Sequence, residues 1–432
     1  MTAAPIQPWA TREFGLTLDH LDSEAGYTVP QLVEPGLRRN PRRAHLLVST
    51  VLGKHLPTAP DAVIAAGDRL GDLVLAALGV PASDESQLDV TVLGFAETAT
   101  GLGHCVATRL RARCYLHSTR RDVPGADTFA GFEEGHSHAT SHLLQPTSPT
   151  LLADGGPLVL VDDEISTGAT AIDAIRALHA RHPRDRYVVA SLVDMRTGGH
   201  RDRTDAAAAD LGVTIDFVSL ASGRTVLPEG LIERVVALPD PVLNPTSGDR
   251  GTVERIDVPW PAAVPDGGRH GFLHSDAAAF DAAIEAAATE VAGRVDHARP
   301  AVVIGHEELM YLPLRLAAAL AERGLAVRFQ TTTRSPAHVL DEPGYPLRRG
   351  YTFVAPEPDD TAARYLYNAH WPDDPTIRPL LIVVADSPAD TDRMRRPGGL
   401  LDVLTGAGND VLLAVVPASD PRVLAHTRKD PA

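Results

Sequence analysis

A short apolar run followed at once by acidic, hydroxyl-bearing and glycine residues constrains this chain more than any other feature. Leu158-Val159-Leu160-Val161 is typical of a buried parallel strand, and Asp162-Asp163-Glu164 follows it directly. Segment 165–170 then leads into residues 169–180, whose apolar positions recur at helical spacing. With a second apolar run at 188–193, this order predicts a βαβ unit and therefore an α/β fold.

The loop after the first run carries groups suited to a sugar phosphate. Asp162 and Asp163 can accept hydrogen bonds from vicinal hydroxyls or help to hold a divalent metal. Backbone N–H groups and hydroxyls at the start of a helix favour a phosphate, because the positive end of the helix dipole lies behind them. Gly168 permits close backbone approach or a positive φ. A ribose 5-phosphate fits both features; the alternative is an acidic surface turn without function.

A second anion-binding loop is expected after the apolar run 90–93, because small residues there let main-chain N–H groups face an anion. The candidate residues in that loop are Glu97, Thr98, Ala99, Thr100 and Gly101. Glu97 fits beside a diphosphate only if Mg²⁺ lies between them. An ordinary turn is the alternative.

Charge and composition narrow the class of protein. The 432 residues carry a formal charge of −16, which argues against broad binding to nucleic acid or to an anionic membrane surface. The two cysteines, Cys105 and Cys114, form no CxxC pair, so neither a disulfide framework nor a zinc ribbon is expected. No apolar run approaches the roughly 20 residues of a membrane span, and the N-terminus lacks a signal-peptide pattern. We expect a cytoplasmic protein.

Segments rich in proline and glycine divide the chain into four parts. Residues 1–39 are expected to form an irregular arm, 40–255 a first domain, 256–269 a linker, and 270–425 a second α/β domain. The elements expected in the second domain are strands at 301–304, 327–330, 380–384 and 411–416, a helix capped by Ser275 and a helix opened by Pro313.

Residues 162–170 resemble the phosphoribosyl-diphosphate (PRPP) signature of type I phosphoribosyltransferases, in which two acidic residues precede a Thr-Thr-Gly-x-Thr loop. The resemblance implies a parallel sheet with a hood, and ribose contacts from Asp162 and Asp163. It also implies that the 5-phosphate is cradled by Ser166, Thr167, Gly168, Ala169 and Thr170. Two residues depart from the pattern: Glu164, where the family usually has an apolar residue, and Ser166 in place of Thr.

Three further segments are similar to a bacterial subgroup of orotate-type phosphoribosyltransferases that is associated with tellurium-resistance and stress operons. These segments are 47–57, which contains Lys54; 115–121, which contains Arg120 and Arg121; and 132–140, which contains His136 and His138. The resemblance covers about residues 40–240.

The basic residues of these segments are expected to neutralise the diphosphate, with solvated side chains as the alternative for Lys54, Arg120 and Arg121. His136 and His138 are expected to recognise the base, transfer a proton or pack the hood, with a solvated loop as the alternative. A zinc site that includes His142 is not expected, because no cysteine or fourth ligand lies at a useful spacing.

In the second domain, Thr333-Arg334-Ser335-Pro336 matches the signature of the TRSP domain, a module found C-terminal to this subgroup. Segments 305–311 and 365–368 are also similar to that module. Glu307 and Glu308 follow one predicted strand and Thr331–Ser335 another, so these loops can share one crevice suited to an anion or a phosphorylated ligand. A structural or oligomerising domain is the alternative.

The resemblance implies Mg²⁺-dependent transfer of ribose 5-phosphate from PRPP to a small nitrogenous acceptor, with release of diphosphate, in the synthesis of a nucleoside-like metabolite. The candidate catalytic residues are Asp162, Asp163 and Arg120, and the two aspartates are expected to hold Mg²⁺ indirectly. Members of the family commonly form homodimers. Two alternatives stay open: a non-catalytic PRPP sensor, and a scaffold protein in which only the C-terminal domain matters.

Overall fold

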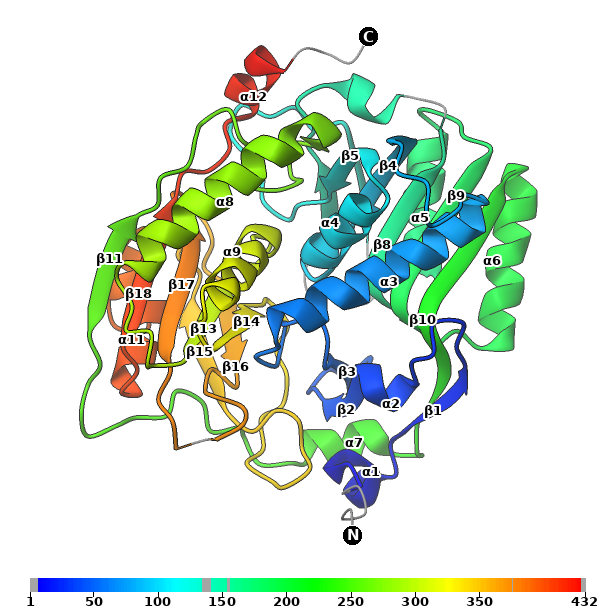
Figure 1. Cartoon of the computed structure of the whole chain (residues 1–432). Helices are drawn as coiled ribbons and strands as arrows, with labels where there is room; N and C mark the ends of the chain where they lie inside the picture. The colour runs from blue at the N-terminus through cyan, green and yellow to red at the C-terminus, as the bar shows by residue number, and fades with distance from the viewer. Residues whose placement is uncertain (1–6, 134–140, 154–155, 375, 429–432) are drawn as a thin grey trace.

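Two parallel-rich sheets organise the molecule (Figure 1). The computed structural model describes residues 7–133, 141–153, 156–374 and 376–428. The first sheet has the order β1 (Thr17–Asp22), β10 (Thr214–Val226), β9 (Arg186–Asp194), β8 (Leu158–Ile165), β4 (Leu88–Gly94), β5 (Ala112–His117) and β12 (Phe272–Leu273). The five central strands are parallel, and β1 and β12 add antiparallel edges.

The second sheet is parallel throughout. Its order is β11 (Val253–Asp257), β18 (Val411–Val416), β17 (Leu380–Asp386), β13 (Ala301–Gly305) and β14 (Val327–Thr331). The other strands of the described residues form three antiparallel pairs: β2 (Val33–Leu37) with β3 (His45–Ser49), β6 (Ala130–Glu133) with β7 (Ser141–Leu144), and β15 (Gly350–Val354) with β16 (Ala363–Tyr367).

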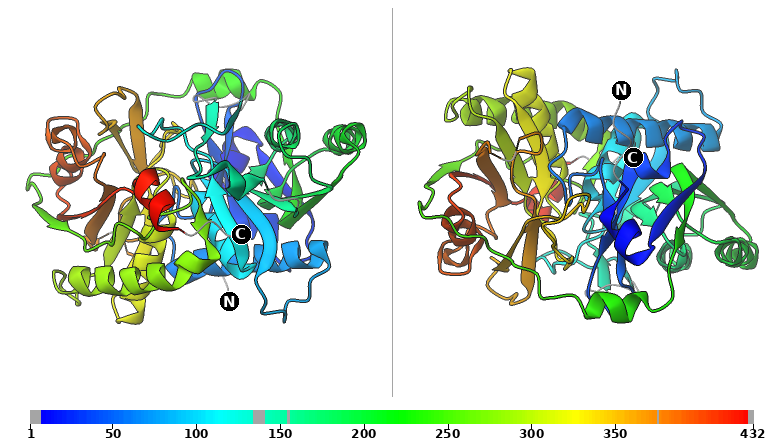
Figure 2. Two further views of the ribbon diagram at one scale, coloured as in Figure 1. Left: turned by 90° about the horizontal axis from the view of Figure 1, so that it is seen from above. Right: turned by 90° about the horizontal axis from the view of Figure 1, so that it is seen from below.

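Helices cover both sheets (Figure 2). The longer ones are α3 (Pro60–Leu78), α4 (Ala99–Arg109), α5 (Ala169–His179), α6 (Gly198–Leu211), α8 (Ala277–Ala292) and α9 (Tyr311–Glu322). The shorter ones are α1 (Trp9–Phe14), α2 (Val29–Leu32), α7 (Leu231–Val236), α10 (Asp392–Arg395), α11 (Leu400–Gly406) and α12 (Pro421–Thr427), with 3₁₀ turns η1 (Pro149–Leu152) and η2 (His274–Asp276). None of the helices in the described ranges has the length and apolar character that a bilayer crossing needs.

Strand β8 shows why a continuous apolar run suits the middle of the first sheet. Successive side chains of a strand point to opposite faces. Val159 and Val161 therefore enter the core that holds α3 and α4, whereas Leu158 and Leu160 enter the core beneath α5. Both faces are covered, which confirms the predicted buried parallel strand and the α/β fold class.

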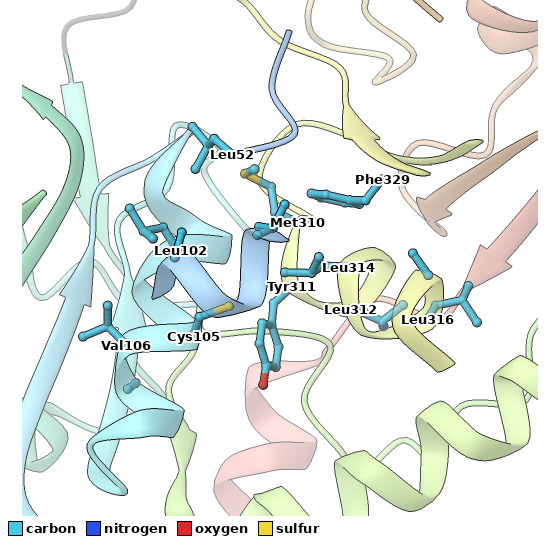
Figure 3. Close-up of a cluster of buried hydrophobic side chains, with 14 of the residues drawn as sticks. Leu52, Leu102, Cys105, Val106, Met310, Tyr311, Leu312, Leu314, Leu316 and Phe329 are labelled. Carbon is cyan, nitrogen blue, oxygen red and sulfur yellow. The ribbon is translucent and has the colours of Figure 1, made fainter. Parts of the chain in front are cut away.

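The two sheets are joined by one continuous hydrophobic core (Figure 3). Leu102 and Cys105 of α4 and Met310 and Leu314 at the start of α9 belong to the same cluster of buried side chains. A Cβ on Gly101 would lie 3.1 Å from the Met310 Cβ, so a small residue at position 101 allows this close packing. The second unit is therefore packed against the first along an apolar interface.

A backbone contact also links the two units at the edge of the second sheet. The Thr58 N–H donates to the Phe329 carbonyl at 2.9 Å, and the Phe329 N–H donates to the Thr58 carbonyl at 2.7 Å. The Thr331 N–H donates to the Gly53 carbonyl at 2.8 Å. Residues 53–58 thereby cover the edge strand β14, and Lys54 is held in this paired segment.

The N-terminal segment differs from the irregular arm expected for residues 1–39. It contains α1, β1, α2 and β2, and β1 pairs with the edge of β10. Pairing satisfies backbone groups that an edge strand would otherwise expose. The short, proline-interrupted elements gave little periodic signal in the sequence, because tertiary pairing rather than local propensity holds them.

The segment predicted as a linker, 256–269, is also part of the folded units. Strand β11 starts at Val253 and pairs with β18, so the second sheet begins before residue 270. The chain then returns to the first sheet, where Phe272 pairs with Tyr115. The Pro-, Gly- and Asp-rich composition reflects this crossing between sheets rather than a free connection.

The predicted strands and helices of the second unit are confirmed, but two helix starts differ. Helix α8 begins at Ala277, and Ser275 lies in the 3₁₀ turn before it. Helix α9 begins at Tyr311, so Pro313 is its third residue rather than its first. The residues directly before α9, Leu309 and Met310, are packed into the core, whereas the turn before α8 has no buried residue.

Candidate functional site

The two loops singled out in the first domain follow neighbouring strands. From β4 the chain moves to β5 on one side, and from β8 it moves to β9 on the other. Loops that leave adjacent parallel strands in opposite directions leave a crevice at the carboxyl ends of those strands. The loops after β4 and β8 lie at this position of the first sheet.

A cavity opens at this crevice and is lined by both units. In the first unit, the β8 end and the loop beyond it contribute residues 162–171, and the turn after β4 contributes 95–98. The β2–β3 region contributes Arg38, Arg43, Leu46 and Leu47, two further loops contribute Lys54 and Arg120, and β7 contributes His142. The second unit contributes Arg334, Ser335, Ala362, Ala363 and Arg364.

The β8 loop has the backbone form that a phosphate cradle needs. Gly168 is the N-cap of α5 and has φ +80°, a conformation that favours glycine. The Thr167 Oγ1 accepts a hydrogen bond from the Ala169 N–H at 3.2 Å. All five predicted cradle residues, 166–170, line the cavity at the start of α5, where the helix dipole favours an anion.

The acidic residues before this loop also line the cavity. The Asp162 Oδ1 accepts from the Asp163 N–H at 2.9 Å, and the Lys54 Nζ lies 4.0 Å from the Asp163 Oδ2. The Asp163 side chain is 20% exposed, so it can still reach a ligand. The sequence placed Lys54 and Asp163 more than a hundred residues apart, and the structure brings them to one cavity.

Glu164, the unusual third acid, has a specific partner. The Arg43 guanidinium donates to the Glu164 carboxylate. Burial acts to raise the pKa of Glu164, but the charge of Arg43 outweighs it and lowers that pKa. The charge that departs from the family pattern is therefore neutralised by a residue of the β2–β3 connection.

The turn after β4 is held in place by both units. The Ala96 N–H donates to the Ser118 Oγ at 2.9 Å, and the Ala96–Glu97 peptide is cis. The Glu97 carboxylate accepts from the Thr333 hydroxyl and from the Arg334 N–H, the latter at 2.9 Å. Burial, followed by the negative charge of Glu307, raises the pKa of Glu97. Glu97 lines the cavity, but its carboxylate is used by the second unit, which corrects the expectation that it faces a diphosphate across Mg²⁺.

The remaining residues of the predicted second loop have a different role. Ala99, Thr100 and Gly101 form the first turn of α4, are buried and are not among the described lining residues. The Thr100 hydroxyl donates to the Glu308 carbonyl at 3.0 Å. The prediction of diphosphate ligands at 99–101 is therefore corrected: this turn packs against the second unit, and the part of the loop that lines the cavity ends at Thr98.

Arg120 and His142 meet at the cavity. The Arg120 Nη2 donates to the Ala96 carbonyl at 3.2 Å and lies 3.4 Å from the His142 Nε2. The His142 Nδ1 lies 2.8 Å from the Ser118 Oγ, and its ring stacks on Phe132 with centroids 4.6 Å apart. The sequence analysis weighed His142 only as a zinc ligand. The pairing of β6 with β7 positions His142 at the cavity. His136 and His138 lie outside the described residues.

Arg121 was expected to contact the diphosphate, but its side chain lies among carboxylates of the second unit. Its guanidinium lies 2.7 Å from Glu357 and 3.2 Å from Asp386, and 3.6 Å from Glu307. It is not among the described residues that line the cavity. Arg120 and Arg121 lie in a bend of the chain beyond β5. Arg120 lines the cavity, while Arg121 anchors its loop to the second unit.

The acidic pair of the second unit is buried among cations. The Arg334 Nε donates to the Glu307 Oε2 at 2.9 Å, and Arg364 donates to the Glu307 Oε1. Glu308 accepts from the Thr119 hydroxyl and the Arg120 N–H, both at 2.7 Å. These contacts correct the expectation of a separate anion crevice at Glu307, Glu308 and Thr331–Ser335, since the carboxylates there hold the protein's own arginines and loops.

One cluster in the described ranges has the composition of a metal site. His306, Glu307 and Glu357 offer ligand atoms within 4.8 Å of one another. Arg121, however, lies against both carboxylates, and His306 Nδ1 is 3.0 Å from the Thr332 Oγ1. A cation that already neutralises the carboxylates disfavours a second one, so we assign this cluster to structural ion pairing.

Family comparisons agree with the division into two units. Residues 32–224 match the PRTase_2 model, described as phosphoribosyl transferase, and residues 266–404 match the TRSP domain C-terminal to PRTase_2. The chain is a phosphoribosyltransferase with a PRTase_2 domain followed by a TRSP domain. The PRTase_2 match contains the β8 loop, and the TRSP match contains Arg334 and Ser335, so both domains line the same cavity.

Solved structures with weaker similarity are also phosphoribosyltransferases. Adenine phosphoribosyltransferase from Rhodothermus marinus is 19% identical with a TM-score of 0.30, covering 44% of this chain and 94% of its own. The enzyme from Trypanosoma brucei, in complex with AMP, pyrophosphate and ribose-5-phosphate, is 13% identical with a TM-score of 0.32, covering 49% and 82%. Orotate phosphoribosyltransferase from Aeropyrum pernix is 16% identical with a TM-score of 0.25, covering 52% and 96%. No curated protein matches the chain, and the assignment rests on the two family models.

Proposed function

We propose that this phosphoribosyltransferase binds PRPP in the cavity between β4 and β8 and transfers ribose 5-phosphate to a small nitrogenous acceptor. One observation carries the proposal: a single cavity is lined by the loop 166–170, by Asp162 and Asp163, and by Arg120 and Lys54. These groups match the three parts of PRPP, which are a 5-phosphate, a diol and a diphosphate. The loop takes the phosphate, the aspartates take the diol, and the cations face the diphosphate.

The donor set of the cavity is suited to Mg²⁺. Mg²⁺ prefers oxygen ligands and keeps several waters, so it is commonly held by one or two carboxylates together with substrate phosphates. Asp162 and Asp163 offer such carboxylates, whereas Glu97 is engaged by Thr333 and Arg334. Bound with PRPP, Mg²⁺ would neutralise negative charge on the diphosphate, and the aspartates would hold it indirectly.

The proposed reaction separates charge along one bond. A nitrogen of the acceptor attacks the ribose C1, the C1–O bond breaks, and the diphosphate leaves with the bonding electrons while the acceptor nitrogen loses its proton. Positive charge develops on the sugar and negative charge on the leaving group. The charge of Asp163 favours the positive charge on the sugar, and the charge of Arg120 favours the negative charge on the leaving group. Binding of the remote 5-phosphate at 166–170 holds the sugar in line for attack.

The acceptor site is assigned to the part of the cavity that these groups leave open. Phe95, Leu46 and Leu47 are apolar residues of the cavity lining, and apolar surface suits a planar base or a base-like ring. A role in the synthesis of a nucleoside-like metabolite, and a cytoplasmic homodimer that binds no nucleic acid, are further parts of the proposal and come from the family resemblance and the acidic charge.

The decisive experiment is titration calorimetry of PRPP with Mg²⁺ on the wild type and on an Asp162→Asn/Asp163→Asn double variant. We expect saturable binding by the wild type and its loss in the double variant. The matched control is Asp202→Asn/Asp205→Asn, which removes two exposed carboxylates from α6.

Each outcome has a distinct meaning. Binding that is lost only in the site variant supports the proposal and justifies a screen of purines, pyrimidines and amines for diphosphate release. Binding without diphosphate release for any acceptor would favour a PRPP sensor. No binding by the wild type would contradict the proposal and favour a scaffold protein.

A further inference from the structure

We propose that the TRSP domain is a working part of the phosphoribosyltransferase site, and that Thr333 and Arg334 of its signature position the diphosphate loop through Glu97. The inference rests on the proposed function, because it assigns the loop 95–98 to the diphosphate. It gives the second domain a role in PRPP binding that its family description leaves open.

The contact with Glu97 is the first observation. Thr333 is fully buried, and its hydroxyl donates to the Glu97 carboxylate. The Arg334 N–H donates to both carboxylate oxygens, at 2.9 Å and 3.2 Å. Hydrogen bonds to a buried carboxylate are stronger than those between neutral groups. Glu97 stands between Ala96 and Thr98, which both line the cavity, so these bonds fix the backbone that faces the diphosphate.

A second, independent contact holds the loop that carries Arg120. Glu308 lies in the turn after β13 with its side chain fully buried, and it accepts from the Thr119 hydroxyl and the Arg120 N–H. Its Oε2 also lies 3.3 Å from the Arg269 Nη2. Both loops assigned to the diphosphate are thus tied to carboxylate contacts that cross between the domains.

The cavity wall is the third observation. Arg334 and Ser335 line the cavity together with residues 166–170, which bind the 5-phosphate in the proposed complex. The shared apolar core between α4 and α9 keeps this wall in place (Figure 3). A site whose supporting contacts sit on a rigidly packed neighbour is preorganised, and preorganisation lowers the cost of binding.

Thr333 is therefore a positioning residue and not a catalytic one. Its hydroxyl acts on PRPP through Glu97 and does not touch the reacting atoms. Loss of that hydroxyl should loosen segment 95–100 and weaken PRPP binding. The rest of the TRSP domain should keep its stability.

The test compares three variants of the full chain by calorimetry with PRPP and Mg²⁺, and by hydrogen exchange of segment 95–100. Thr333→Val removes the hydroxyl with little change of shape and should weaken PRPP binding about tenfold while exchange in the segment rises. Thr333→Ser keeps the hydroxyl and should recover most of the lost affinity. Thr405→Val is the matched control, because Thr405 is also buried in the second unit and its hydroxyl donates only to carbonyls of α11.

A double-mutant cycle with Glu97→Gln distinguishes a role of Thr333 in positioning Glu97 from a general loss of structure. If Thr333 acts through Glu97, Thr333→Val costs much less than tenfold in the Glu97→Gln background. Additive effects, or wild-type affinity in Thr333→Val, would overturn the inference and leave the proposed function standing. An equal loss in Thr405→Val would also overturn it. If the wild type itself binds no PRPP, the proposed function fails and the inference fails with it.

Discussion

The two sheets each have a point where strand order reverses, and the protein uses the two points in opposite ways. In the first sheet, between β4 and β8, the strand ends carry Asp162 and Asp163, which border an open cavity. In the second sheet, between β13 and β17, the strand ends carry Glu307, Glu308 and Asp386, which are buried. Topology alone makes both points candidates for a ligand site.

The difference lies in what satisfies the acidic groups. Asp163 keeps 20% of its side chain exposed, with Lys54 at 4.0 Å. The Glu307 side chain is fully buried and is met by Arg334 and Arg364. Glu307 has both carboxylate oxygens engaged by arginines in a fully buried setting, so it is not available to a ligand. Acidic residues at a strand end therefore mark a site only where the fold leaves them accessible.

The largest expected effect is on stability and concerns the buried acidic residues of the second sheet. Glu307→Ala leaves buried arginines without their main partner, so we expect the free energy of unfolding to fall by about 3–5 kcal/mol. Denaturant titration of the full chain measures it. Asp373→Ala is the matched control: Asp373 pairs with Arg328 at 2.8 Å but is 66% exposed, so its loss should cost less than about 1 kcal/mol. Similar costs for both variants would contradict the structural assignment of Glu307.

Low pH should weaken the interface between the two units, because it protonates the Glu308 carboxylate. Burial acts to raise the pKa of Glu308, but Arg269 and other nearby charges outweigh it and lower the pKa from its ordinary 4.5 to about 2. A lowered pKa contributes stability above pH 4.5 that is lost as the pH falls toward 2, on the order of 3 kcal/mol.

Denaturant midpoints at pH 7 and pH 3 measure this contribution. The wild type should lose more stability between these values than Glu308→Gln, which has no carboxylate to protonate at this position. Glu290→Gln, at a partly exposed position of α8, should keep the wild-type pH dependence. If Glu308→Gln lost as much stability between pH 7 and pH 3 as the wild type, groups other than Glu308 would control the acid sensitivity.

Asp163→Asn tests the accessible acidic residues at the strand ends of the first sheet. The change keeps the shape of the side chain and removes its charge, so turnover should fall at least ~10-fold, equivalent to ~1.4 kcal/mol, while the unfolding midpoint stays close to that of the wild type. Diphosphate release is the measurement once an acceptor is found. Unchanged turnover would remove Asp163 from the catalytic groups.

The smallest expected effect concerns the phosphate loop. Gly168→Ala places a side chain at φ +80°, and its Cβ would lie 2.9 Å from the Thr204 Cγ2. We expect a loss of stability of about 1 kcal/mol together with weaker PRPP binding. Gly212→Ala, at φ +69° with open space around it, should lose similar stability and keep its PRPP affinity. Equal PRPP affinity in both variants would mean that the shape of the loop does not limit binding.

Much of the site could be predicted from the sequence, because its parts are local. A buried strand, two acids and a hydroxyl- and glycine-bearing loop stand together within residues 158–170, and their order determines which groups line the cavity. The strands and helices around them were predictable for the same reason, since apolar periodicity is a local signal.

The separate roles of Arg120 and Arg121 could not be predicted. Adjacent arginines look equivalent in a sequence, but one faces the cavity and the other pairs with Glu357 and Asp386 across the domain interface. Glu97 is a similar case, because its partners Thr333 and Arg334 lie more than two hundred residues away.

The sequence by itself determined the α/β class, the loop 166–170 and the acids before it, since neighbouring residues define these features. Only the tertiary structure decided that Arg334 and Ser335 of the TRSP signature line the same cavity, and that Glu307 and Glu308 pair with the protein's own cations. The physical reason is that burial and ion pairing depend on which distant segments pack together. A charged residue has the same letter in the sequence whether a ligand or another side chain satisfies it.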